Sequence, residues 1–199
     1  MNYIQLQQAI AGYLHRDDMA QQIKVGIELA GARIGRDLRH RANMQTTVFT
    51  ASAQGIAFSP QYLREITQIS FPAGTFANQL QVVSEETWGN VQLAGGSAPK
   101  CYTYQGGIIK VAPVSAETQF QVTGYFQPPP LVNDTDTNPV LTYAPQLYVY
   151  AALMESFFWS QDGDLTSFAK AQYGEEIQRL NNEARSEKTG INPRMIRSR

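Results

Sequence analysis

The chain has 199 residues, of which 43% are hydrophobic and 11% aromatic, and its formal net charge is -1. This composition excludes a disordered chain and suits one good core, or a core with a smaller module. The near-zero net charge excludes an overall electrostatic footprint for nucleic acid or a membrane surface. A single cysteine excludes an intrachain disulfide and a cysteine-rich metal site.

Residues 1–45 predict a helical hairpin. Asn2 suits the N-cap of the first helix, and Asp17 or Asp18 suits that of the second after a tight break. The apolar residues of the first helix mostly share one face: Ile4, Ala9, Ile10, Tyr13 and Leu14. Those of the second helix form a stripe with steps of four and three: Met19, Ile23, Ile27, Ala30, Ile34 and Leu38. Two amphipathic helices with so short a connection form an antiparallel pair.

Residues 46–130 predict a β-rich module, because short alternating runs there stand between turn signals. The expected strands cover 46–51, 56–58, 65–71, 79–83, 102–105, 108–111 and 120–126. Gly106-Gly107 suits the turn of a two-residue hairpin, and residues 84–88 suit a single capped helical turn. Strands of this length and spacing predict an antiparallel sandwich or a small barrel.

Three prolines at 128–130 and a polar run at 133–138 mark the return to helices. Pro145 suits the first turn of a helix. That helix is expected to bury Leu147, Tyr150, Ala151, Met154 and Phe158. After a break at 161–164, the last helix carries a stripe: Leu165, Phe168, Ala169, Tyr173, Ile177 and Leu180.

The predicted fold class is therefore α+β, a helical bundle built from both ends of the chain with an antiparallel β-sandwich or small barrel inserted in it. The expected domains are an N-terminal helical hairpin, the inserted β-rich module, the C-terminal helices that complete the bundle, and a basic docking tail. Their bounds are 1–45, 46–130, 131–188 and 189–199.

No pattern predicts a catalytic residue, a metal ligand or a cofactor site, so we expect no enzyme. The D-x-D-x-N run at 134–138 resembles the start of a calcium loop, but Pro139 and Pro145 stand where that loop needs Gly and Glu. His15 and His40 have no carboxylate or cysteine at ligand spacing. Ordinary solvated or helix-end histidines are therefore expected at both positions.

Cys101 stands in a strand-like stretch, where a buried, inert thiol is expected rather than a reactive one. Residues 1–5 lack the charged and apolar regions of a signal peptide. An apolar run of about 18 residues, as a membrane helix requires, is also absent from the sequence. We therefore expect a soluble protein made in the cytoplasm.

Charged residues indicate contacts with other proteins. The end of the second helix carries Arg33, Arg36, Arg39 and Arg41. These cations suit either a solvated helix C-terminus or inter-subunit pairing with a neighbour's β module, through Glu85 and Glu86. The same two acids alternatively form a solvated helix cap. The C-terminal segment combines cations with apolar anchors, as a docking segment does: Arg185, Lys188, Arg194, Met195, Ile196, Arg197 and Arg199.

Two stretches, one in each helical part of the chain, together carry a resemblance to a known family. The first comprises residues 3–18 (YIQLxxAIAxYLHRDD) and 27–39 (IELAxARIxRDLR), and the second residues 128–131 (PPxL) and 142–155 (TxAPxLYxYAALxE). In this order, with a β-rich insert between them, they resemble the head-to-tail adaptor (connector) proteins of tailed bacteriophages. The resemblance is to the short-tailed phage type, related in plan to tail-tubular A-type proteins.

The resemblance implies a virion structural protein at the head–tail junction. Such adaptors form a ring of about twelve copies beneath the portal, as head-to-tail contacts repeated by rotation allow. The implied partners are other copies of the chain, the portal protein, and the tail nozzle or tail-tube protein. DNA passes through the lumen during ejection without sequence-specific binding, and no membrane contact or cofactor is implied.

In this interpretation the helical bundle forms the ring body, the β module faces a neighbour or the tail, and the basic tail of the chain reaches the portal. The alternative is a carbohydrate- or receptor-binding accessory tail protein. Its binding platform would be exposed aromatic side chains of the β module: Trp88, Tyr102, Tyr104 and Tyr125. Burial of these residues in the sandwich core would exclude such a platform.

Overall fold

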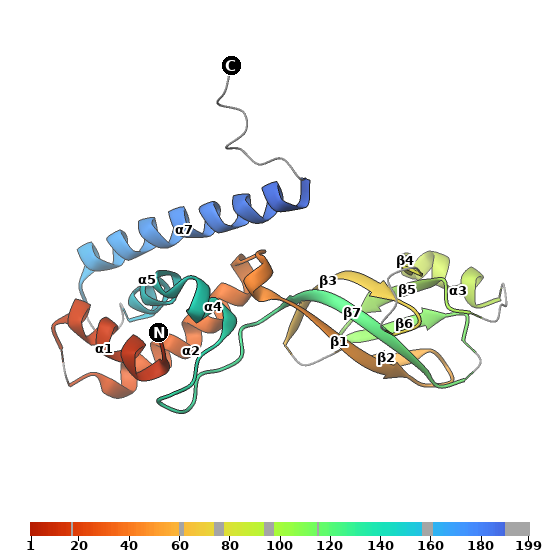
Figure 1. Cartoon of the computed structure of the whole chain (residues 1–199), viewed down its shortest axis with the longest axis horizontal. Coiled ribbons are helices and arrows are strands. Elements are labelled where there is room, and N and C mark those ends of the chain that lie inside the picture. The colour runs from red at the N-terminus through yellow and green to blue at the C-terminus, as the bar shows by residue number, and fades with distance from the viewer. Residues whose placement is uncertain are drawn as a thin grey trace, which may run out of the picture. The chain divides into compact units, whose positions relative to one another are not determined.

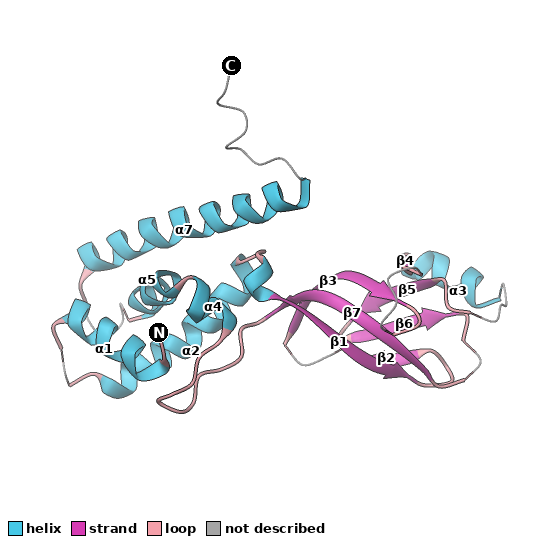
Figure 2. Cartoon of the chain, in the orientation of Figure 1, coloured by secondary structure: helices cyan, strands magenta, loops and turns pink. Residues whose placement is uncertain are grey.

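In a computed structural model, the described residues are 1–16, 18–59, 62–73, 78–93, 98–114, 116–156 and 161–189. By its internal contacts the chain divides into two compact units. The helical unit comprises Met1–Met44 and Gln127–Arg199, and the β unit comprises Gln45–Phe126. Helices dominate the first unit and strands the second (Figures 1 and 2). The α+β class predicted from the sequence is confirmed.

The helical unit is organised around one central helix. Its elements are α1 (Tyr3–Leu14), α2 (Ala20–Asp37), the 3-10 helix η1 (Arg41–Asn43), α4 (Pro139–Tyr143), α5 (Pro145–Glu155) and α7 (Gly163–Thr189). Helix α5 packs against both α2 and α7, and α1 and α4 also contact it. Because α5 has neighbours on several sides, it buries more than one face: Leu147, Tyr148, Val149, Ala151, Ala152 and Leu153.

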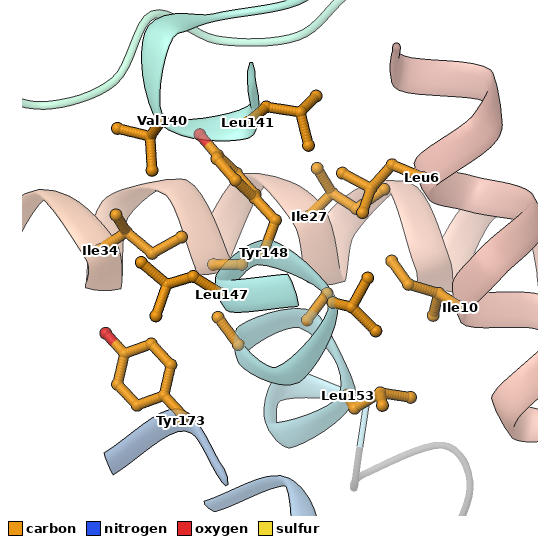
Figure 3. Close-up of a cluster of buried hydrophobic side chains, with 14 of the residues drawn as sticks. Leu6, Ile10, Ile27, Ile34, Val140, Leu141, Leu147, Tyr148, Leu153 and Tyr173 are labelled. Carbon is orange, nitrogen blue, oxygen red and sulfur yellow. The ribbon is translucent and has the colours of Figure 1, made fainter. Parts of the chain in front are cut away.

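The apolar stripe predicted for α2 forms the base of this core. All six of its residues are buried: Met19, Ile23, Ile27, Ala30, Ile34 and Leu38. Figure 3 shows Ile27 and Ile34 on the side of α2 that faces Leu147 and Tyr148 of α5. The steps of four and three place these side chains along one face, as the sequence predicts.

Helix α1 has its predicted N-cap but not its predicted buried face. Asn2 Oδ1 accepts the Gln5 N–H at 3.0 Å, in a capping box. The buried side chains are Tyr3, Leu6 and Ile10, whereas Ile4 and Tyr13 are exposed. Backbone hydrogen bonds from residues 3 and 4 to the carbonyls of residues 136 and 134 fix the rotation of the helix. Asp18 does not cap α2, because it pairs with Arg16 and the N-cap position is Met19.

The return segment from the β unit is held by Asn138. Its Oδ1 accepts the Leu141 N–H at 2.8 Å and caps α4, and its Nδ2 donates to the Pro129 carbonyl at 3.1 Å. The same Nδ2 donates to the hydroxyl of Tyr148 at 2.8 Å. Burial raises the pKa of Tyr148 to about 12. The polar run that resembles a calcium loop thus serves to fix the turn into the helices.

The β unit contains two sheets and one helix. Its elements are β1 (Met44–Ala51), β2 (Ile56–Phe58), β3 (Leu63–Ser70), β4 (Gln81–Val82), α3 (Glu85–Leu93), β5 (Cys101–Gln105), β6 (Ile108–Ala112) and β7 (Thr118–Phe126). The sheets have the strand orders β1-β7-β3 and β2-β6-β5-β4. One buried cluster takes side chains from both sheets, among them Phe120, Ile69, Ile109 and Tyr102. The sheets therefore form a sandwich, and the described strands close no barrel.

The hairpin predicted at Gly106-Gly107 is present. Gln105 pairs with Ile108, and the two glycines have φ angles of 59° and 79°, which glycine adopts without a steric cost. The single turn predicted at 84–88 is wrong in length, because α3 has nine residues, and buried Trp88 packs it against Cys101 and Ala112. The strand predicted at 79–83 is present in a shorter form, as β4 has two residues and pairs in parallel with β5.

Candidate interaction surfaces

The first arginine of the predicted cluster has a partner within the chain. Arg33 of α2 donates from Nε to Oε1 of Glu155 at the end of α5, 2.6 Å away. Their side chains are 32% and 17% exposed, so the pair is largely shielded from water. It joins two helices of the core across 122 residues of sequence. A contact at that separation gives no signal in the sequence pattern.

Arg39 takes part in the hydrogen bonds by which Asn181 of α7 holds the end of α2, which we call the Asn181 clasp. Asn181 Oδ1 accepts the Arg39 backbone N–H at 2.7 Å, and Asn181 Nδ2 donates to the Asp37 carbonyl at 3.1 Å. The Arg39 side chain donates to the carbonyls of Arg36 and Leu38 at 2.8 and 3.1 Å. Arg39 therefore satisfies carbonyls at the end of its own helix, as a cation at a C-terminus does. Arg36 is exposed.

Arg41 belongs to a second contact between the same segments. It forms an ion pair with Glu187 of α7 at 3.2 Å, and its guanidinium carbon lies 5.8 Å from the ring centre of Tyr143. The Tyr143 hydroxyl donates to Glu183 at 2.7 Å, and the Tyr143 ring stacks on His40 at 4.7 Å. The C-terminal half of α7 is thus fastened to the end of α2 and to η1.

Of the two environments expected for His40, the structure has the helix end and not the solvated one, because His40 is the N-cap of η1 and is fully buried. Its Nδ1 accepts the Ala42 N–H at 3.2 Å, whereas Nε2 has no hydrogen-bond partner. Burial lowers the pKa of His40, and nearby Arg41 and Arg179 act in the same direction. The carboxylates of Glu183 and Glu187 oppose that shift in pKa. The imidazole is therefore held in its neutral form.

Two further buried polar atoms lie in η1, and a groove lies beside η1 and α4. Both the Oδ1 and Nδ2 atoms of Asn43 are buried without a hydrogen-bond partner. A groove of about 580 Å³ is lined by Arg41, Ala42, Thr137, Asn138, Pro139, Thr142 and Tyr143.

The acidic candidates lie in the first turn of α3, where the helix dipole favours them. Glu85 accepts a hydrogen bond from Lys110 Nζ of β6 at 2.8 Å, a pairing that the sequence does not reveal. Glu86 is exposed. Pairing of these acids with the arginines of another subunit remains a prediction.

The basic docking segment is described only in part. Arg185 is exposed near the end of α7, and Lys188 belongs to the same helix. The remaining candidates lie outside the described residues: Arg194, Met195, Ile196, Arg197 and Arg199. Their role in portal binding remains a prediction.

The aromatic platform of the alternative interpretation is not formed. Trp88, Tyr102 and Tyr125 are 5%, 8% and 4% exposed, and only Tyr104 of the four is exposed, at 38%.

Burial raises the pKa of the Cys101 thiol, which donates a weak hydrogen bond to the Ala112 carbonyl. The buried, inert thiol predicted from the sequence is therefore present.

A groove that sequence patterns do not reveal opens beside Tyr104. It has a volume of about 560 Å³ and is lined by Arg64, Glu65, Ile66, Val82, Val83, Ser84, Glu85, Tyr102, Thr103, Tyr104 and Gln105. These residues come from β3 of one sheet, from β4 and β5 of the other, and from the start of α3. Only the packing of two sheets brings them together.

Among the described residues, no cluster of three or more His, Cys, Asp or Glu residues has an arrangement suited to a metal ion. None of the described helices has the length and apolar character that crossing a membrane requires.

Similarity to known proteins agrees with the sequence resemblance. The model of the SU10 adaptor protein family matches residues 1–197. No curated protein matches the chain. Because the family match covers almost the whole chain, the predicted relationship to phage head-to-tail adaptors is confirmed. The chain belongs to the SU10 adaptor protein family and is a structural adaptor component of a bacteriophage virion.

Proposed function

We propose that this protein forms a ring that joins the phage portal to the tail and lines part of the DNA conduit. The observation that carries the proposal is the family match over residues 1–197. The order of elements supports it, since a helical hairpin, a β unit and a helical return follow one another as in head-to-tail adaptors. A head-to-tail contact repeated by rotation closes into a ring when the rotation allows, and the resemblance to head-to-tail adaptors leads us to assign about twelve copies to it.

In this proposal helix α7 carries the portal-binding segment. The helix has 27 residues, which corresponds to a length of about 40 Å. Its C-terminal half is fastened to α2 and η1 through Asn181 and Glu187, so its end has a defined direction from the helical unit. Arg185 and Lys188 near that end begin the basic segment that we assign to the portal.

The same proposal assigns a passive role toward DNA. The net charge of -1 gives the ring no strong attraction for the phosphate backbone. DNA therefore passes through the lumen without sequence-specific binding, and the β unit is the part that meets a neighbour or the tail nozzle.

A truncation tests the portal contact, and the structure sets where it should begin. Residues 184–189 belong to α7, where Ala184 is buried and Glu187 pairs with Arg41. Removal of residues 190–199 therefore spares the described helical unit. We expect the truncated protein to keep the wild-type circular dichroism spectrum and to lose attachment to the portal.

A charge variant with a matched control refines this test. Replacement of Arg194, Arg197 and Arg199 by Ala removes three cations from the segment. A control that replaces the exposed Lys24, Lys100 and Lys170 by Ala removes the same charge from other surfaces. We expect only the arginine variant to lose portal attachment.

Mass photometry of the protein, alone and with portal rings from the same phage, gives the readout. The expected result is a monomer alone and an addition of about twelve copies to each portal. Full attachment by the truncated protein would refute the role of the C-terminal segment, and a wild-type protein indifferent to the portal would refute the proposed function.

A further inference from the structure

The β unit presents an unusually exposed apolar side chain at one edge of a sheet. Phe58 of β2 is 81% exposed, more than any other large apolar residue described in the chain. Ile56, two residues earlier on the same side of the strand, is 44% exposed. We name Ile56 and Phe58 the β2 knob. The cross-strand neighbour of Phe58 is the apolar Ile108, and that of Ile56 is Lys110, whose charge is paired with Glu85.

The groove beside Tyr104 lies at the opposite edge of the same sheet. In the described sheet β2 is one edge and β4 the other. Val82 of β4, which is 70% exposed, forms an apolar wall of this groove with the rings of Tyr102 and Tyr104. We name it the β4–β5 groove.

The charges of the β4–β5 groove favour an apolar, uncharged occupant. Arg64, Glu65 and Glu85 line it, so both signs are present, and Glu85 is already paired with Lys110. A site for an anionic nucleic acid or for a strongly basic peptide would carry an excess of one sign. The volume of about 560 Å³ is sufficient for a phenylalanine side chain.

The strand pairing shows that a subunit does not fill its own groove. Phe58 pairs with Ile108 and Ile108 with Gln105, so these three side chains share one face of the sheet. Tyr102 and Tyr104 lie toward the other face, whereas Thr103 and Gln105, which also line the groove, share the face of Phe58. Knob and groove therefore lie at opposite edges of the sheet, and Phe58, which is 81% exposed, does not fill the groove of its own subunit.

We propose that the β2 knob of one subunit occupies the β4–β5 groove of the next subunit, and that this contact repeats around the ring. The inference rests on the proposed ring function and names the surfaces that build it. Two different surfaces on one molecule that fit each other make a heterologous contact, which closes into a ring when the rotation allows.

The small size of the contact predicts that ring assembly needs the portal. Burial of one phenylalanine and one isoleucine is small compared with a stable interface of about 800 Å² per partner. Subunits held side by side on a portal experience a much higher effective concentration, and each forms two such contacts in a closed ring. The contact is thus weak between free subunits and sufficient within the ring.

Disulfide trapping tests the contact directly. Phe58→Cys and Val82→Cys proteins are mixed in equal amounts on portal rings and treated with a mild oxidant. The natural Cys101 is buried and does not compete. We expect a covalent dimer from the mixture and none from either variant alone. The matched control uses Val48→Cys in place of Phe58→Cys. Val48 is 54% exposed on β1 of the other sheet, and we expect no dimer between Val48→Cys and Val82→Cys.

A second pair of variants measures the contribution of the knob. Phe58→Ser is compared with Val132→Ser, which also replaces an exposed apolar side chain by Ser, at a residue of the helical unit that is 72% exposed. We expect Phe58→Ser to require about tenfold more protein to fill the portal ring, as loss of a central anchor does, and Val132→Ser to behave as wild type.

The outcomes separate this inference from the proposed function. Complete rings on the portal without a Phe58–Val82 crosslink would overturn the knob-in-groove contact and leave the adaptor function intact. A wild-type protein that neither binds the portal nor crosslinks would overturn both. Glycan binding that Tyr104→Ala abolishes, with ring filling unchanged, would assign the groove to carbohydrate and also overturn the contact.

Discussion

The Tyr173 hydroxyl donates a hydrogen bond to Oδ2 of Asp37 across 2.8 Å, and so joins the middle of α7 to the last residue of α2. Burial raises the pKa of Tyr173, and its bond to the Asp37 carboxylate raises it further. This bond and the Asn181 clasp add to the burial of Ala169, Tyr173 and Leu180, which packs the otherwise largely polar helix on the helical unit.

Removal of the Tyr173 hydroxyl should therefore loosen α7. We expect Tyr173→Phe to lower the free energy of unfolding by about 1 kcal/mol, because Asp37 loses a charge-assisted hydrogen bond. Tyr143→Phe makes the same chemical change at an exposed tyrosine and should have a smaller effect. Urea denaturation followed by circular dichroism measures both. Equal effects of the two variants would refute the assigned role of Tyr173.

The pair of Arg33 and Glu155 should contribute to stability more than the surface pairs do. Glu155→Gln leaves the half-buried Arg33 without its counter-charge, and we expect a loss of about 1–2 kcal/mol in the free energy of unfolding. Glu176→Gln weakens an i,i+3 pair on one helix whose Arg179 side chain is 57% exposed, and it should cost less than about 0.5 kcal/mol. Urea denaturation at low and high salt measures the free energy of unfolding of both variants. A Glu155→Gln protein as stable as the wild type would contradict the prediction.

His40 should make the stability of the protein depend on pH. Because burial lowers its pKa in the folded state below the unfolded value of about 6.5, its contribution is complete above that pH. The contribution is lost as the pH falls through the folded pKa, since the unfolded chain binds a proton more readily. Replacement by Asn keeps an acceptor for the Ala42 N–H and removes the titration.

The measurement is the free energy of unfolding of wild type and His40→Asn at pH 7.5, 6.5 and 5.5, values spaced about one unit apart around the histidine range. The stability advantage of the wild type over the variant should shrink as the pH falls. The control is His15→Asn, which makes the same replacement at the exposed C-cap residue of α1. A constant difference between wild type and His40→Asn would refute the prediction.

Gly124 should tolerate no side chain, because β3 and β7 approach each other closely there. A Cβ atom at this position would lie 2.3 Å from the Glu65 carbonyl oxygen. We expect Gly124→Ala to destabilise the β unit by about 1–3 kcal/mol. Gly89→Ala meets no atom within 4 Å in α3 and should be neutral or stabilising. Thermal unfolding of the two variants compares them, and a stabilised Gly124→Ala protein would contradict the argument.

Local sequence patterns predicted those elements whose signals are local. The stripe from Met19 to Leu38 predicted the buried face of α2 because its period is that of a helix. The Gly106-Gly107 turn predicted its hairpin because the turn requires positive φ angles. The resemblance to phage adaptors rested on the order of such elements. The family match over residues 1–197 confirms that resemblance.

Properties that depend on contacts across the chain were not predictable. Tyr3 and Leu6 face inward because the start of α1 is fixed by the return segment near residue 135. Arg33 is engaged by Glu155, 122 residues away, and His40 is buried beneath Tyr143. The β4–β5 groove arises from two sheets packed together, so no single stretch of sequence contains it.

The strand order of the three-stranded sheet has a consequence for how such proteins diversify. The chain enters the β unit through β1 and leaves it through β7, which are neighbours, and the Thr46 and Thr123 hydroxyls lie 3.0 Å apart. Because the two ends of the β unit lie close together, it connects the two parts of the helical unit as a short loop would. The entropy cost of closing that connection is correspondingly small. A different β module whose two ends lie equally close together could therefore replace this one without a change in the fold of the helical unit.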